Sequence, residues 1–315
     1  MKGGVRVGTP PFCLMASHMF ERYLDSLQQR SLPRGGFPDH SHGEYRPDAT
    51  AWAVITLSRQ LSAADHVSAA RRRLLDSQGP DGRISMSSDH PESFWPTPLA
   101  ILAWIPSTDY QPAIEKALNF LLHASGLHWE KSPEEAIGHD TAIPGWPWMG
   151  GTHSWVLPTA LAMQALKVTG LGEHARVKDG EKMLLDRQLP HGGWNAGNTS
   201  VFGQELRPFP ETTGAALNAL AGHVPQKSVS KSLEYLIGTA PSLRTPLSLG
   251  WTLLGLKSWS IAPSNSLEWI QETLERGIRH GEYDTPALSL LLTAALAPNG
   301  LDSMITQPEN VTTTP

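Results

Sequence analysis

One segment, residues 180–220, constrains the fold more than any other, because its pattern recurs along the chain. Its first helix ends at Pro190 and the glycine pair that follows, since proline removes a helical hydrogen bond and glycine permits a tight left-handed exit. We expect Trp194 to fold back onto this helix end, where Gln188 can bond free backbone groups of the turn. The helix that restarts after Pro210 has almost only small or apolar side chains, which predicts burial on most of its faces.

The same unit occurs about six times, at a period of roughly 35–60 residues. Each unit pairs an amphipathic helix, which must face water on one side, with an apolar helix, which must be covered on nearly every side. Closing six pairs into a ring meets both needs, so we predict an all-α (α/α)6 toroid with six inner and six outer helices. The alternative is an open array of helix pairs, which would leave its terminal pairs uncapped. The predicted inner helices are Ala49–Leu61, Pro98–Ile105, Leu157–Val168, Thr212–Ala221, Pro246–Leu256 and Pro286–Ala297.

A single ring domain is expected over residues 19–298, which suits a chain of 315 residues. Residues 1–18 are predicted to be an irregular extension or a tag remnant, because Ser17-His18-Met19 looks like a cloning scar. The polar residues 299–315 are predicted to form a flexible tail.

Composition narrows the function classes. The net charge of −5 argues against a general nucleic-acid binder. Cys13 is the only cysteine, so the chain has no internal disulfide and no multi-cysteine zinc site. No apolar run is long enough for a membrane span and no signal peptide is evident, so we expect a cytoplasmic protein without an integral span. The oligomeric state is left open.

Most of the unusual residues lie in the loops that lead into the inner helices, and in a ring these loops all meet at one end. The positive ends of the inner-helix dipoles face the same end. A convergence of ionisable and aromatic groups there is typical of a pocket. For Glu211 and Asp284 the alternative is a helix cap or a first-turn acid. The candidate catalytic residues are Asp48, Asp140, His153, Glu211 and Asp284.

The chain has 11 tryptophans, and their placement suggests two uses. Aromatic faces in a cavity can stabilise a cation, whereas the same rings in a core fill volume. Trp129 and Trp194 are interpreted as structural residues of repeat turns. The Gly- and Pro-rich segment 145–151 is interpreted as a lid or pocket wall. The candidate substrate-binding residues are Tyr45, Trp52, Trp95, Trp146, Trp148, Trp155, Trp251 and Tyr283.

The helix–turn stretches LLDRQLPHGGW and LLDSQGPDGRI resemble the Gln-Trp repeats of squalene-hopene and oxidosqualene cyclases. The restarts DATAWAV, LPTALAMQAL and ETTGAALNAL resemble inner helices of those enzymes and of protein prenyltransferase beta subunits. The resemblance extends from about Phe20 to Ala297. It implies a single-domain member of the terpenoid cyclase and prenyltransferase toroid family.

The resemblance also implies a role for Asp48. In cyclases that begin by protonating an alkene, an Asp-rich motif precedes Thr-Ala at an inner-helix start, and Asp48 matches the middle catalytic acid of that motif. Arg46 and Ala49 stand where the family has neighbouring aspartates, which hold the reactive proton. Asp48 could therefore serve as an ordinary general acid or base, or it could cap its helix near Arg46.

Neither a metal nor a cofactor is predicted. As an alternative, His40, His42, His139 and His153 could converge as a nitrogen and oxygen site. Protein prenyltransferases hold zinc with Asp, Cys and His at inner-helix starts, but no cysteine occupies such a place here. No Asp-Asp-x-x-Asp motif for diphosphate ionisation is present either.

The resemblance implies an enzyme that binds a small apolar, isoprenoid-type substrate in the central cavity and carries out acid- or base-initiated cyclisation or isomerisation. Two alternatives stay open. One is a glycan-active lyase or hydrolase on the same ring, which would also use carboxylates, histidine and stacked tryptophan. The other is a non-catalytic ring that binds a ligand or a partner.

Overall fold

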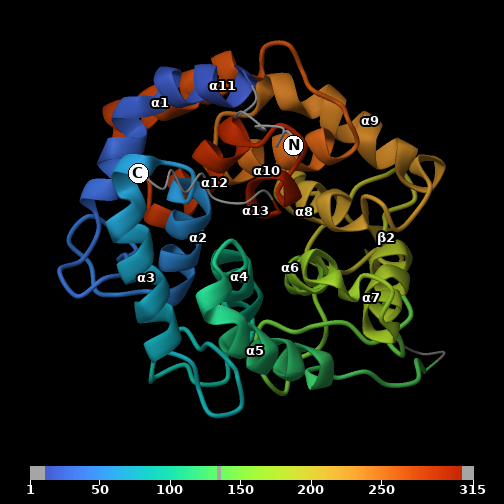
Figure 1. The fold of residues 1–315 in the computed structure, drawn as a ribbon. Coiled ribbons are helices and arrows are strands. Elements are labelled where there is room, and N and C mark those ends of the chain that lie inside the picture. The colour runs from blue at the N-terminus through green and yellow to red at the C-terminus, as the bar shows by residue number, and fades with distance from the viewer. Residues whose placement is uncertain (1–10, 133–135, 307–315) are drawn as a thin grey trace, which may run out of the picture.

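The computed structural model describes residues 11–132 and 136–306. Over these residues, helices alternate along the chain between an inner and an outer ring (Figure 1). Consecutive inner helices pack against each other, and α12 packs against α2, which closes the circle. The predicted all-α (α/α)6 toroid is confirmed. The inner helices are α2 Pro47–Leu57, α4 Pro96–Trp104, α6 Val156–Leu166, α8 Pro210–Leu220, α10 Pro246–Ser258 and α12 Thr285–Leu296.

The outer helices present one face to water and pack the other against the inner ring. They are α1 Pro11–Gln29, α3 Ala64–Asp76, α5 Gln111–His123, α7 Ala175–Asp186, α9 Ser230–Thr239 and α11 Ser266–His280. Short helical turns join several pairs: η1 Leu61–Ala63, η2 Thr108–Tyr110, η3 Lys167–Leu171, η4 Gln226–Val229 and η5 Ala240–Ser242. A small hairpin pairs β1 Ser200–Val201 with β2 Gln204–Glu205. No helix in the described part of the chain is both long enough and apolar enough to span a bilayer.

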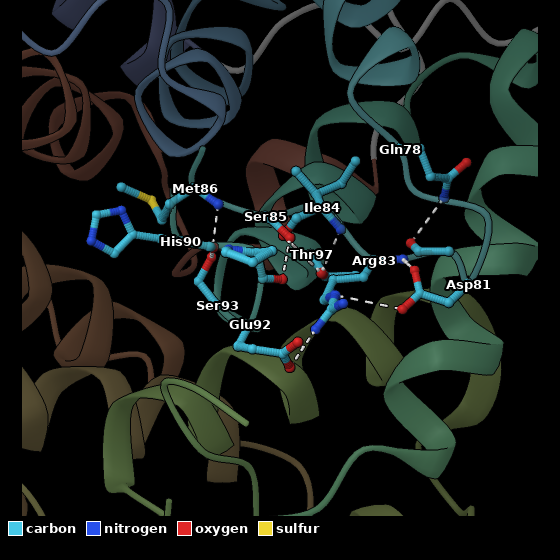
Figure 2. A network of polar contacts seen from close by, with 12 residues as sticks. Gln78, Asp81, Arg83, Ile84, Ser85, Met86, His90, Glu92, Ser93 and Thr97 are labelled. Atoms are coloured by element: carbon cyan, nitrogen blue, oxygen red, sulfur yellow. Dashed lines mark hydrogen bonds and ion pairs between the residues drawn. The ribbon is translucent and has the colours of Figure 1, made fainter. Parts of the chain in front are cut away.

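The same type of hydrogen bond joins the turn to the inner helix in each of the first four helix pairs. The residue after the turn donates its backbone N–H to the hydroxyl of a threonine in the inner helix that follows. Figure 2 shows the second example, in which the Ile84 nitrogen lies 3.0 Å from Thr97 Oγ1. We call this contact the threonine clamp. Its four pairs are Phe37 with Thr50, Ile84 with Thr97, Trp146 with Thr159 and Trp194 with Thr213.

Glycine in these turns allows close packing against the next outer helix. Gly192 has a φ of +99°, and a Cβ there would lie 2.6 Å from the Lys231 carbonyl carbon of α9. Gly82, in the turn before Ile84, lies equally close to the backbone of Lys116 in α5. Only glycine fits such a position, because a side chain would clash with backbone atoms that cannot move away. The turns therefore fix the spacing between successive pairs.

The prediction for Trp194 agrees with its position, whereas that for Gln188 is wrong. The buried indole of Trp194 donates to the Leu184 carbonyl of its own outer helix at 2.6 Å. The Gln188 amide donates instead to Ser232 Oγ of α9, and this oxygen also accepts the Gly193 N–H, both at 2.7 Å. Gln188 thus reaches the turn through the neighbouring repeat.

Trp146, and not Trp129, is the turn residue of the third pair. The Trp146 indole is buried and donates to the Leu121 carbonyl at 2.9 Å, whereas Trp129 is 40% exposed. The interpretation of Trp129 as a repeat-turn residue is therefore wrong, as is that of Trp146 as part of a lid. The reason is an insertion between the end of α5 and Gly145, which separates the turn from its helix in the sequence.

Both ends of the ring domain differ from the prediction. α1 begins at Pro11, before the expected start at residue 19. After α12 the chain forms α13, Asp302–Ile305, in which Met304 and Ile305 are buried, so residues 301–306 are not a flexible tail. Apolar burial holds this helix, and the Gln164 amide and the Lys167 ammonium both contact Asp302. The predicted extension at 1–10 and tail at 307–315 lie outside the described residues.

The predicted inner helices are recovered with small shifts of their ends. The largest shift concerns the first, which was expected to run to Leu61 but ends at Leu57. The chain turns at Ser58, and the exposed Leu61 opens a short 3-10 helix instead. Five of the inner helices carry proline at one of their first two positions, where its missing N–H costs no helical hydrogen bond.

Candidate site at the mouth of the ring

The inner helices all begin at one end of the ring, which we call the mouth. Because outer and inner helices alternate, every connection from an outer to an inner helix lies at this end. The first four of these connections are long loops, whereas those before α10 and α12 are short. Figure 1 shows the long loops toward the outside of the ring. The candidate residues of the sequence analysis lie on these loops and on the first two turns of the inner helices.

Asp48 lies in the first turn of α2 and is only 1% exposed. The Arg46 guanidinium holds it with two hydrogen bonds, at 2.9 Å to Oδ1 and 2.6 Å to Oδ2. Arg46 also lies 3.1 Å from the Asp39 carboxylate. Burial raises the pKa of Asp48 above its ordinary value, while the Arg46 hydrogen bonds and charge act in the opposite direction. The two-pronged geometry is that of an ionised carboxylate with its counter-ion.

A pair of indoles lies one helical turn below Asp48. Trp52 follows Asp48 by four residues, so the two side chains share a face of α2. The Trp52 ring meets that of Trp251 on α10 edge to face, with centroids 5.6 Å apart. Since α2 and α10 are not neighbours in the ring, this contact crosses its interior. The shared face of α2 therefore points to the axis, and Asp48 belongs to the interior rather than to the outer surface.

Glu211 and Asp284 occupy different surroundings. Glu211, in the first turn of α8, accepts a hydrogen bond from Ser248 of α10 at 2.9 Å and is half-buried. Asp284 caps α12, because its carboxylate accepts the Ala287 N–H at 2.7 Å. The capping alternative thus holds for Asp284.

Two tryptophans join the loops before α4 and α6. The Trp95 and Trp148 rings meet edge to face at 5.7 Å. The backbone supports the contact, since the Phe94 N–H donates to the Trp148 carbonyl at 2.9 Å. The Trp155 ring lies 4.6 Å from that of the exposed His153. These partly exposed rings form an aromatic stretch on the α4 and α6 side of the mouth.

Three expected substrate-binding residues pack against outer helices instead. The Tyr45 ring lies beneath the Arg73 guanidinium of α3, and its hydroxyl is 2.9 Å from Ser77. The Tyr283 hydroxyl donates to the Thr273 carbonyl of α11 at 2.8 Å. Trp146 is the buried turn residue described above. All three side chains point toward the outer helices and not toward the Trp52–Trp251 pair. Each lies in the connection that precedes an inner helix, where the backbone turns the side chain outward.

Asp140 and His139 belong to the long loop before α6. The Asp140 carboxylate accepts the Ala142 N–H at 2.9 Å, which closes a local turn rather than facing Asp48. Burial, followed by the nearby Arg187 charge, lowers the pKa of His139 to about 3. The same two causes lower the pKa of His153. Both imidazoles are therefore neutral over most of the physiological range.

The alternative of a histidine metal site is wrong for this structure. His40 lies 3.2 Å from Asp39 in the loop before α2, whereas His139 and His153 lie in the loop before α6. His42 is exposed on the first of these loops. Over residues 11–132 and 136–306, no three His, Cys, Asp or Glu side chains are grouped so that they could hold an ion.

Sequence reasoning missed two features of the mouth. It treated Arg46 as a substitution in a motif, whereas Arg46 is the direct partner of both Asp39 and Asp48. It also missed Ser248 and Leu247, which precede Trp251 by three and four residues and thus share its helix face. That spacing was visible in the sequence, but it has meaning only once Trp251 is known to point inward.

The comparisons with known proteins show the fold. No protein-family model matches the sequence, and no curated protein matches it either. Among solved structures, a protein from Actinoplanes is 20% identical, with 92% of this chain and 99% of that chain covered and a TM-score of 0.58. The GH76A alpha-1,6-mannanase from Salegentibacter sp. HEL1_6 is 13% identical, with 90% and 98% covered and a TM-score of 0.60.

A type II terpene cyclase, MstE from Scytonema, is also similar in structure. In its complex with geranylgeranyl dihydroxybenzoate it is 13% identical to this chain, with 94% of this chain and 97% of that chain covered and a TM-score of 0.58. At such identities the likeness establishes a common α/α toroid and not a common activity. The same ring carries a terpene cyclase and a glycoside hydrolase, so the activity of this protein has to be argued from its mouth.

Proposed function

We propose that the protein binds a small apolar, isoprenoid-type molecule at the mouth of the ring and acts on it by acid–base chemistry. One observation carries the proposal: a buried carboxylate, Asp48, lies one helical turn above the Trp52–Trp251 indole pair, on the face of α2 that points to the ring axis. All residues of α2 and α4 are buried, so the interior beside this carboxylate is apolar.

The chemistry follows from the residues in place. The negative charge of Asp48 and the electron-rich faces of Trp52 and Trp251 favour a positively charged centre in an apolar substrate. Protonation of an alkene carbon by the acid form of Asp48, which burial favours, would leave a carbocation beside the indoles and a carboxylate that Arg46 holds. Transfer of a proton from a neighbouring carbon of this cation back to the Asp48 carboxylate would complete an isomerisation. Arg46 is the positioning residue, since it sets both the orientation and the proton affinity of Asp48.

The likeness in fold to MstE, solved with geranylgeranyl dihydroxybenzoate, supports an isoprenoid class of ligand. A glycan-active enzyme is the second candidate, and two observations favour it. Trp95, Trp148 and Trp155 are partly exposed at the mouth, as stacking surfaces for sugars would be, and the mannanase is as similar in fold as the cyclase. A non-catalytic binding ring is the third, because Asp48 already has its charge partner within the protein.

Ligand binding separates these candidates. The wild-type protein would be titrated with geranylgeraniol and, separately, with alpha-1,6-mannotriose, while tryptophan fluorescence is recorded. We expect geranylgeraniol to quench the fluorescence, and Trp251→Leu to weaken its binding by about tenfold or more, since one wall of the site is lost. The matched control is Trp269→Leu on the outer helix α11, which should leave the affinity unchanged.

Three other results would contradict parts of the proposal. Binding of mannotriose that depends on Trp95 would replace the proposal with the glycan-active reading. If geranylgeraniol binds but Asp48→Asn converts it as the wild type does, Asp48 is not the group that donates the proton. Mass spectrometry of the extracted ligand, with an isotopically heavy solvent as the proton source, would show whether a carbon-bound proton has exchanged. Absence of exchange in the wild type favours the non-catalytic ring.

A further inference from the structure

A second pocket lies at the seam where the ring closes, between outer helices and the connection that leads into α12. Helix α1 of the first pair and α11 of the last lie side by side there (Figure 1). The pocket between them has a volume of about 340 Å³, which is within the range of small-molecule sites. Its walls are contributed by α1, α11, the loop that follows α11, and Leu288 of α12. It shares none of these lining residues with the Asp48 interior.

The pocket contains a buried cation. The Arg30 side chain is only 5% exposed, although it lines the pocket. Its Nη1 donates to the Tyr283 carbonyl at 2.9 Å and lies 3.2 Å from Thr285 Oγ1. Its Nε has no hydrogen-bond partner among the residues that the structure describes, and burial lowers the pKa of the guanidinium. A guanidinium with five donors is thus left with bonding capacity that the protein does not use.

The counter-ion of Arg30 is loosely held. The nearest carboxylate oxygen, on Glu282, lies 3.6 Å from Arg30 Nη2, which is beyond a good charged hydrogen bond. The Glu282 side chain is 68% exposed and also accepts a hydrogen bond from Ser41. Water and Ser41 can therefore keep Glu282 solvated if another anion takes its place beside Arg30.

The remaining wall is apolar. Leu274 and Ile278 of α11 and Leu288 of α12 line it, together with the rings of Tyr23 and Tyr283. We propose that this pocket binds a small amphipathic carboxylate, whose head group pairs with Arg30 and whose hydrocarbon chain lies against this wall. The carboxylate matches the planar donor geometry of the guanidinium, and the chain accounts for the apolar side of the pocket.

Calorimetric titration with octanoate tests the proposal, with octanol and octyl phosphate as the comparison ligands. We expect octanoate to bind with one site per chain and octanol, which lacks the charge, to bind at least about tenfold more weakly. Octyl phosphate at an affinity equal to or above that of octanoate would overturn the choice of carboxylate. No heat with octanoate would overturn the site itself.

A matched pair of variants locates the binding. Ile278 at the lip of the pocket is 66% exposed, and Ile237 on α9, away from it, is 47% exposed. Ile278→Glu should weaken octanoate by about tenfold or more through like-charge repulsion, while Ile237→Glu should leave it unchanged. Equal losses in both variants, or none in Ile278→Glu, would overturn the assignment. Arg30→Met should abolish binding, and a thermal melt would separate this loss from unfolding. None of these variants alters Asp48, Trp52 or Trp251, so a failure here is distinguishable from a failure of the proposed function.

Discussion

The connection from the outer to the inner helix is stabilised differently in the first four helix pairs and in the last two. In the first four, a threonine clamp ties the turn to the inner helix. In the fifth pair, η5 and a short extended segment connect the two helices. The buried Thr252 hydroxyl of α10 has no hydrogen-bond partner within residues 11–132 and 136–306. In the sixth, the cap at Asp284 replaces the clamp.

The two regions are held together by different kinds of contact. The clamps are neutral, dry contacts within one repeat, and they set the same geometry four times. At the closing seam the contacts are ionic and join segments far apart in the chain, as Arg30 does with Glu282. Neutral buried hydrogen bonds do not respond to pH, whereas ion pairs at a partly buried seam do. The seam also contains the second pocket.

The largest expected effect is at the fourth turn. Trp194→Ala removes a buried indole and its hydrogen bond to Leu184, and should lower the free energy of unfolding by about 3–5 kcal/mol. Urea denaturation followed by circular dichroism measures the loss. The control is Trp129→Ala, whose 40% exposed side chain should matter much less. Similar losses in the two variants would mean that the clamped turns are no more important than the loops.

The next effect concerns an ion pair, the type of contact found at the seam, although this one lies in the first pair. Arg46→Met leaves the buried Asp48 carboxylate without its partner and should destabilise the protein by about 2–3 kcal/mol at pH 7. Removal of Arg46 also removes what opposes the raised pKa of Asp48, so this pKa rises further. When the pKa of Asp48 is higher in the folded than in the unfolded protein, burial of Asp48 costs nothing below the unfolded-state pKa of about 4. The free energy of unfolding then falls as the pH rises through the folded-state pKa.

Thermal melts from pH 4 to pH 8 would therefore show the deficit of Arg46→Met growing with pH. The double variant Arg46→Met with Asp48→Asn removes the titrating group and should recover most of the loss at pH 7. A deficit that does not depend on pH, or a double variant no better than the single one, would contradict the ion-pair account.

Two buried threonines sharpen the contrast between clamped and unclamped pairs. Thr213→Val removes the acceptor of the Trp194 N–H and should cost about 1–2 kcal/mol. Thr252→Val replaces a buried hydroxyl that bonds to no described part of the chain, and should be neutral or stabilise by up to about 1 kcal/mol. Opposite signs in one denaturation series are the expected result. Equal costs would show that the threonine clamp contributes nothing specific.

The smallest effect is at the sixth pair. Asp284→Ala removes the cap of α12 and should cost about 1 kcal/mol, while Asp284→Asn, which can still accept the Ala287 N–H, should cost a few tenths. Chemical denaturation resolves the difference. A loss as large as that of Trp194→Ala would mean that the seam, and not the clamped turns, limits the stability of the ring.

The sequence alone determined the features that repeat locally. The inner helices are apolar all round and the turns carry proline and glycine, so helix positions, the ring and the return of Trp194 onto Leu184 were predictable from short windows. The physical reason is that these preferences arise within a few residues: burial from composition, helix ends from backbone geometry, and the turn from glycine at positive φ.

Only the tertiary structure decided which residues meet across the ring. That Trp52 of α2 contacts Trp251 of α10, and that Tyr45 packs outward on Arg73 of α3, depends on the packing of segments far apart in the chain. The exchange of roles between Trp129 and Trp146 has the same origin, because an insertion shifts the turn away from its helix without changing the local pattern. Contacts between distant segments are set by packing after ring closure, and no local preference encodes them.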